Sequence, residues 1–255
     1  PVVIDSGHGQ FASDTAVSAE DAAYYQRYLE GQSPDNESFI GFESSNDLTT
    51  EAGPDLLNED GTPAARSLII SAPTTELTAA ERATVAEFAD AGGAVILLGS
   101  AADQDAVSNF EPVLTELNAN VSFTDEAVTD ETNSLTDDPA VFTTGNVSDA
   151  YADLFTSFTT ENTTSTQPSG VGPVMLDSVS SLLNANGEPL TNDSVVAVSA
   201  ESTATNSDTD GNGDAVSYPS GTDIPVVAVD GSVVGVTGPF VASDTNFSYG
   251  NEEVM

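Results

Sequence analysis

The first half of the chain alternates short apolar runs with segments of helical periodicity. The apolar runs lie at Val2–Asp5, Leu68–Ser71 and Ala94–Leu98. The segments of helical periodicity lie at Ala19–Glu30, Ala79–Ala91 and Ala106–Leu117. Strands that are apolar along nearly their whole length are typical of parallel sheets with both faces covered. The pattern therefore predicts an α/β fold in which helices flank a mostly parallel central sheet, as in flavodoxin-like proteins.

The helix over Ala79–Ala91 has the clearest boundaries. Thr78 and Glu81 have the spacing of a capping box, in which each side chain bonds the backbone N–H of the other residue. Gly92 and Gly93 follow the last apolar position and are typical of a helix end. The segment is therefore expected to join two neighbouring strands of the sheet.

The second half of the chain is more polar. Strands are predicted at Val171–Ser178 and Val195–Ala200. The runs Ile224–Val229 and Ser232–Thr237 are joined by Asp230 and Gly231, a strong signal for an antiparallel hairpin near the C-terminus. Polar stretches near 32–65, 124–170 and 201–222 are expected to be insertions in one domain over 1–255.

The charge balance narrows the classes of function. The 255 residues include 42 acidic residues (Asp and Glu) and only 3 basic ones (Arg and Lys), which gives a formal net charge of -39. With so few cations to neutralise phosphate, nucleic-acid binding is excluded, and docking on anionic lipid is disfavoured. No apolar run reaches the ~18 residues of a membrane helix, so direct membrane insertion is not expected.

The distribution of the charge along the chain indicates a protein that works in concentrated salt. Acidic residues are spread along the chain without a long block, and 38% of the residues are apolar. This combination favours a folded protein whose carboxylates are screened by concentrated salt over a disordered chain. The chain contains no cysteine, so it has neither a disulfide nor a thiol nucleophile. The composition therefore predicts a halophilic protein.

Four stretches resemble the glutamine-amidotransferase-like (flavodoxin-like) domain found in secreted and surface proteins of halophilic archaea. They are VVIDSGHGQ (2–10), LIISAPTTELTAAERATVAEFADAGGAVILLGSAAD (68–103), FTDEAVTDETN (123–133) and VVGVTGPFVASDTNFSYGNEE (233–253). The resemblance implies one domain over 1–255 and is compatible with a closing helix beyond Met255. Catalytic relatives of that family use a Cys nucleophile, which this chain lacks, so the resemblance implies the fold and not the activity.

The ends of the predicted strands hold the candidate catalytic residues. His8 follows the first strand, and Ser100 follows the strand over Ala94–Leu98, where a strand-to-helix elbow would place a nucleophile. Carboxylates expected near the same edge of the sheet come from Asp5, Asp103, Asp105 and Asp244. Such a cluster suits a general base or a hard cation. The alternative is a structural role, in which the imidazole of His8 hydrogen-bonds a loop carbonyl and stabilises the turn.

One segment resembles a calcium-binding loop. Asn206, Asp208, Asp210 and Asp214 occupy positions 1, 3, 5 and 9, and Gly211 occupies position 6. Position 12, which is normally Glu, is Ser217, and no helical pattern flanks the segment. The two interpretations are a calcium site and a solvated acidic loop.

Six sequons for N-glycosylation are present, at Asn36, Asn120, Asn146, Asn162, Asn192 and Asn246. They are compatible with an exported glycoprotein. Taken together, the observations predict a non-catalytic extracellular or cell-surface domain that binds protein partners or self-assembles. The alternative is a secreted hydrolase, or an accessory domain of one, that uses the strand-end residues around His8 and Ser100.

Overall fold

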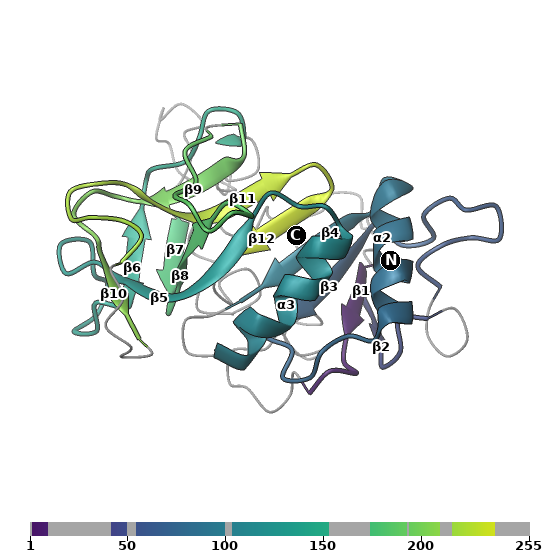
Figure 1. Cartoon of the computed structure of the whole chain (residues 1–255). Coiled ribbons are helices and arrows are strands. Elements are labelled where there is room, and N and C mark those ends of the chain that lie inside the picture. Colours follow the sequence, from purple (N-terminus) through teal and green to yellow (C-terminus); the bar gives the residue numbers. More distant parts are fainter. Residues whose placement is uncertain are drawn as a thin grey trace, which may run out of the picture.

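The computed structural model describes residues 2–9, 42–49, 55–99, 104–152, 174–192, 194–209 and 216–237. These residues form twelve strands and two helices (Figure 1). Seven strands make one large sheet, and the other five make two small sheets. The candidate site lies at the large sheet, whose strands hold most of the apolar runs predicted from the sequence.

The large sheet is mixed. Its strands follow the order β2 (Phe42–Ser45), β1 (Val2–Asp5), β3 (Ser67–Ser71), β4 (Ala94–Leu98), β12 (Val233–Val236), β11 (Ile224–Asp230) and β9 (Val196–Ala200). The first five strands are parallel, and β11 is antiparallel to both of its neighbours. The carboxyl ends of β1, β3 and β4 therefore lie along one edge of the sheet.

The two small sheets lie at the end of the molecule next to β9 and β11 (Figure 1). One contains β10 (Thr205–Asp208), β5 (Ser122–Thr129) and β8 (Ser180–Leu183), and the other contains β6 (Val141–Thr144) and β7 (Val174–Asp177). Every pair in both sheets is antiparallel. β7 and β8 are buried along most of their length, whereas β10 is partly exposed.

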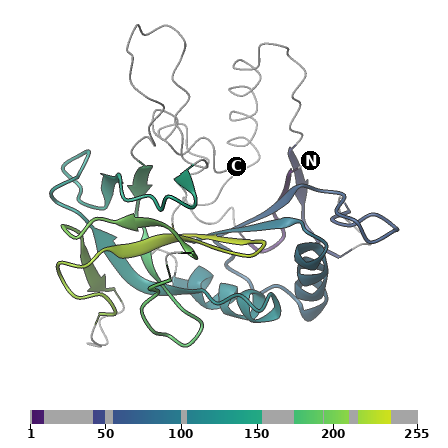
Figure 2. The ribbon, with the colours of Figure 1, turned by 90° about the horizontal axis from the view of Figure 1, so that it is seen from above.

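The two faces of the large sheet are covered by different elements. The helices α2 (Ala79–Asp90) and α3 (Gln104–Glu116) both lie on the same side of it (Figure 2). Phe88 of α2 and Phe110 of α3 belong to a buried cluster with alternate residues of β3 and β4. The opposite cluster joins the other residues of those strands to Phe142 of β6 and to β7. Strands, and not helices, thus cover that second face among the described residues.

The predicted fold class is wrong. The described residues are mostly β, with several sheets that include antiparallel ones, and they do not form a helix-flanked, mostly parallel α/β sheet. The apolar composition of a strand predicts that both of its faces are buried, but it does not predict whether helices or strands cover them. The prediction assigned helices to both faces, whereas β6 and β7 cover one of them.

Several local predictions are confirmed. The strands at Val2–Asp5 and Ala94–Leu98 form as predicted, and the capping box of Thr78 and Glu81 is present. The C-terminal hairpin forms as well, with Gly231 at a φ of 62° in its turn. The polar stretches 124–170 and 201–222 contain the strands β6 and β10. The helix predicted over Ala19–Glu30 lies outside the described residues.

Candidate functional site

The single histidine of the chain lies between two carboxylates. His8 is 6% exposed, and Asp5, at the end of β1, is 1% exposed. Nδ1 of His8 lies 2.8 Å from Oδ2 and 3.0 Å from Oδ1 of Asp5. Nε2 of His8 lies 3.3 Å from Oε2 of Glu81, in the first turn of α2. We call these three residues the His8 cluster.

Glu81 serves three segments at once. Its Oε2 accepts hydrogen bonds from the backbone N–H of Thr78 at 2.8 Å and from the Thr78 hydroxyl at 2.6 Å. Its Oε1 accepts a bond of 3.5 Å from the N–H of Leu48, just beyond β2. The capping carboxylate thereby joins the start of α2 to the loops after β1 and β2, which share the same edge of the sheet.

The backbone around His8 is held as closely as its ring. The carbonyl oxygen of His8 accepts hydrogen bonds from the N–H groups of Thr74 and Thr75, at 2.8 and 3.1 Å. A Cβ at Gly7 would lie 2.3 Å from the carbonyl oxygen of Asn46, so this close approach of two loops requires glycine. His8 is therefore fixed both by its ring and by its backbone.

The charges of the His8 cluster determine its protonation. Burial by itself lowers the pKa of His8, but the hydrogen bond to Asp5 and the negative charges of Asp5 and Glu81 outweigh it and raise that pKa above 6.5. Burial tends to raise the pKa of Glu81, yet the hydrogen bonds from Thr78 and the neighbouring His8 lower it below 4.5. Both shifts therefore stabilise an imidazolium between carboxylates relative to an isolated histidine and glutamate.

The arrangement can position or transfer a proton, but its main effect is to join segments. In a Ser–His–Asp triad, one ring nitrogen faces an acid and the other faces a hydroxyl nucleophile. Here Nδ1 faces Asp5 as in a triad, whereas Nε2 faces Glu81. Sequence reasoning missed Glu81 as a partner of His8, although its capping box placed it at a helix start beside the strand ends.

The side chains that the structure describes include none of the other candidates predicted at the strand ends. Ser100, Asp103 and Asp244 lie outside the described residues. Asp105 lies in α3, where its side chain is not described. A catalytic role for Ser100 with His8 therefore stays a prediction.

The predicted calcium segment begins on a strand. Asn206 and Asp208 lie in β10, whereas Asp210 and Asp214 fall outside the described residues. The Asn206 amide donates to Oε2 of Glu126 on β5, and Ser217 donates to Oε1 of the same carboxylate. Across the described ranges, no three His, Asp or Glu residues are grouped in a way that could hold a metal ion. Calcium binding here stays a prediction.

The sequons differ in their surroundings. Asn120 and Asn192 are exposed, and Asn146 is half-buried. Asn146 lies beside β9, where its carbonyl oxygen accepts a bond from the N–H of Ser199. The remaining three, Asn36, Asn162 and Asn246, lie outside the described residues.

A groove of about 720 Å³ lies beside β9. We call it the β9 groove, and its size is typical of ligand sites. Its apolar walls include Val147, Leu190, Tyr218, Pro219 and Pro225. Asp149 and Asp223 add carboxylates. The phenol of Tyr218 is fixed, because it donates to the carbonyl oxygen of Leu182 and accepts from the N–H of Leu190.

Of the described helices, neither α2 nor α3 is long and apolar enough to cross a bilayer.

A family comparison identifies the chain. The family described as "Domain of unknown function (DUF4350)" matches residues 46–254, which is most of the 255 residues. The chain belongs to the DUF4350 family. Glu81 and the β9 groove lie within the matched part of the DUF4350 domain, whereas Asp5 and His8 precede it. No curated protein matches the sequence.

A solved structure shares the fold of the DUF4350 domain. It is described as the "mmIFT52 N-terminal domain", and the match has a TM-score of 0.64 at 13% sequence identity. The match covers 100% of this chain and 94% of that one. The likeness establishes a shared fold. The resemblance to glutamine-amidotransferase-like domains stays a prediction.

Proposed function

We propose that this DUF4350 domain is a non-catalytic module for protein interaction or assembly, and that it works in concentrated salt at the cell surface or outside the cell. The observation that carries the proposal is the position of His8. The residue best suited to acid–base chemistry is 6% exposed and contacts a carboxylate through each ring nitrogen. His8 joins the end of β1, the start of α2 and the loop at Thr74 and Thr75. This position suits a structural residue better than one that acts on a substrate.

The hydrolase alternative requires a different arrangement at Nε2. A nucleophilic hydroxyl would have to replace Glu81, whose negative charge favours the protonated imidazole. A protonated imidazole cannot accept the proton of a nucleophile, so it is a poor general base. The observed contacts thus support a structural role for His8.

The likeness to the mmIFT52 N-terminal domain supports an interaction role. That domain belongs to an intraflagellar transport protein. We carry over the general role of protein interaction or assembly, and neither the partners nor the location of that protein.

The β9 groove is the surface we assign to a partner. In molar salt, charge interactions are screened within about 3 Å, so long-range attraction to the acidic surface is weak. A partner must then be held by apolar contact and hydrogen bonds, which salt leaves intact. The groove supplies both, through Leu190, Tyr218 and Pro225 on its apolar side and through Thr191, Ser199 and Thr222 on its polar side.

The acidic composition supports a protein that works in concentrated salt. A net charge of -39 on 255 residues is strongly repulsive in dilute buffer and is screened in brine. A surface or extracellular location fits this composition and the sequons.

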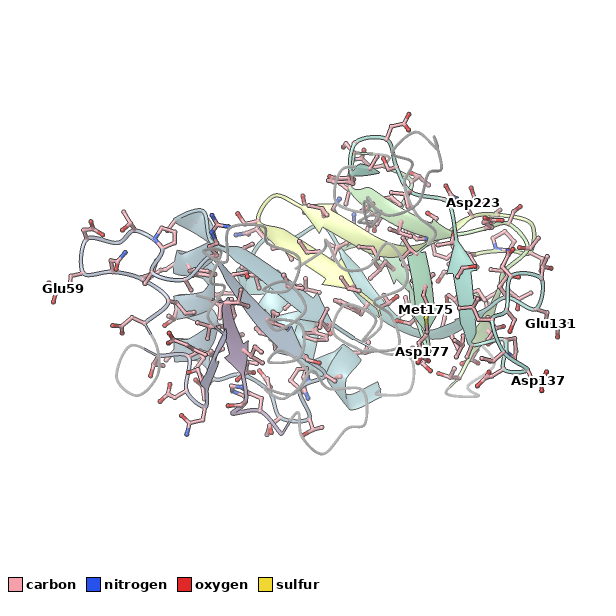
Figure 3. The ribbon with its side chains drawn as sticks, turned by 180° about the vertical axis from the view of Figure 1, so that it is seen from behind. Glu59, Glu131, Asp137, Met175, Asp177 and Asp223 are labelled. Atoms are coloured by element: carbon pink, nitrogen blue, oxygen red, sulfur yellow. The ribbon has the colours of Figure 1, made fainter. Side chains whose placement is uncertain are left out.

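Site-specific photocrosslinking tests the proposal. A photoreactive residue is placed at Thr222, on the rim of the β9 groove, and the full chain is irradiated in native surface and secreted fractions in molar salt. The matched control carries the same residue at Glu59, which lies at the opposite end of the molecule from Asp223 (Figure 3). We expect discrete crosslinked products with Thr222 and none with Glu59.

Two results would overturn the proposal. Crosslinking that is absent or equal at the two positions removes the groove as the interaction surface. Turnover of an ester, phosphoester or glycoside that disappears in a folded His8→Ala variant establishes an enzyme instead.

A further inference from the structure

We infer that Asn192 is the preferred N-glycosylation acceptor among the sequons that the structure describes, and that its substrate is a lipid-diphosphate-linked sugar. The inference concerns acceptor chemistry and does not depend on the interaction role proposed above. It starts from the turn that precedes β9, where Asn192 and Ser194 are both exposed.

The side chain of Asn192 is held by the residue two positions later. Its Oδ1 accepts the backbone N–H of Ser194 at 3.1 Å and the Ser194 hydroxyl at 2.7 Å. These are the two groups that a sequon supplies at its third position, and here both converge on the amide of the acceptor. Both bonds are made by the carbonyl oxygen, and the Nδ2 group that reacts makes no hydrogen bond to the described residues.

This arrangement favours the chemistry of transfer. A carboxamide nitrogen is a weak nucleophile because its lone pair is delocalised toward the oxygen. Two hydrogen bonds to Oδ1 stabilise negative charge there and make an Nδ2 proton easier to remove. A base of the transferase takes that proton, Nδ2 bonds to C1 of the sugar, and the bond from C1 to the diphosphate oxygen breaks. The diphosphate leaves with the electron pair, and no redox change occurs.

The turn is anchored from both sides. The carbonyl oxygen of Asn192 accepts the N–H groups of Val195 and Val196, at 2.8 and 3.0 Å. The Tyr151 hydroxyl donates to the carbonyl oxygen of Ser194. The bonds between Asn192 and Ser194 span two residues, so the same turn can also form in a chain that has not yet folded.

The other two described sequons lack this geometry. At Asn146, the N–H of Ser148 donates to the carbonyl oxygen of Ala197, and Val147 forms a bridge with Val198. That sequon is extended along β9, and a transferase cannot wrap around it. At Asn120, the Ser122 hydroxyl is directed to the carbonyl oxygen of Phe123 and not to the asparagine.

In vitro glycosylation of the folded full chain tests the inference. The protein is incubated in the presence of stabilising salt with an oligosaccharyltransferase and a lipid-diphosphate oligosaccharide, and the peptides are mapped by mass spectrometry. We expect the glycan mass on the Asn192 peptide, less on the Asn120 peptide and none on the Asn146 peptide. A denatured sample, modified at all three, shows that each sequon is chemically competent.

Variants separate the sequon from the fold. Asn192→Asp keeps an oxygen acceptor for Ser194 and removes the reactive nitrogen, so the glycan is lost while the circular-dichroism spectrum stays that of the parent. Ser194→Ala loses the glycan as well, and Ser194→Thr retains it. The inference is overturned if the folded chain is unmodified at Asn192, or if Asn146 or Asn120 is modified to an equal or greater extent.

Discussion

Replacing His8 by alanine tests the His8 cluster directly. The change removes the contact of 2.8 Å to Asp5 and the contact of 3.3 Å to Glu81. Hydrogen bonds to charged groups contribute about 1.5–3 kcal/mol each. The Glu81 contact is long, and Glu81 keeps its bonds from Thr78. Most of the loss therefore comes from Asp5, which is 1% exposed in the parent and loses its cationic partner in the variant. We expect a loss of about 3 to 4 kcal/mol in the free energy of unfolding.

The effect should depend on pH with a defined sign. The pKa of His8 is raised above 6.5 in the folded state, so its contribution is complete below about pH 6.5 and is lost as the pH rises through the folded pKa. The pKa of Glu81 is lowered below 4.5, so its contribution is present above pH 4.5 and is lost as the pH falls through its folded pKa. The difference between parent and variant should therefore be greatest between those two values.

Thermal unfolding in molar salt, followed by circular dichroism, measures the difference. For a chain of this size, the expected loss corresponds to a fall in Tm of roughly 10 °C near pH 6, which shrinks toward pH 9. The matched control is Glu76→Gln, which breaks an exposed ion pair with Arg82 and should change stability by less than about 1 kcal/mol. A His8→Ala variant with the Tm of the parent, or a difference that grows with pH, refutes the reasoning.

Three further predictions concern the helix α2 and the charge. Thr78→Ala removes the cap of α2 and should lower stability by about 1 kcal/mol in denaturant titration. Thr84 is half-buried and its hydroxyl bonds the carbonyl oxygen of Ala80 in the same helix, so Thr84→Ala should be close to neutral. Gly93→Ala places a Cβ 2.2 Å from the ring of buried Phe88 and should lower stability by about 1–3 kcal/mol; recovery in the double variant with Phe88→Leu checks that the cause is steric. Dialysis into millimolar salt should abolish the circular-dichroism signal of the folded chain, because 42 acidic residues then repel one another unscreened, and an unchanged spectrum contradicts the proposed salt adaptation.

The local elements were readable from the sequence because their signals lie within a few residues of one another. The capping box spans Thr78 to Glu81, and the hairpin turn is made by Asp230 and Gly231. The apolar composition of β3 and β4 likewise identified them as buried strands. Strands such as β10, with the sequence TNSD, carry no such signal, because their polar residues become ordered by pairing with β5.

Only part of the His8 cluster could be predicted from the sequence. His8 and Asp5 are three residues apart, and the turn after β1 brings them together. Glu81 is 73 residues further along the chain, and its place opposite Nε2 depends on how α2 is set against the ends of β1 and β2. No local pattern encodes that distance.

The sequence by itself determined the acidic surface, the absence of thiol chemistry, the buried strands and the boundaries of α2, since each of these depends on residue type or on neighbours in the chain. The tertiary structure decided what covers the second face of the large sheet, how β9 comes to border a groove, and that the single histidine contacts carboxylates through both nitrogens. These features arise from contacts between segments far apart in the chain, and such contacts are selected by packing and burial of the whole molecule and not by local preference.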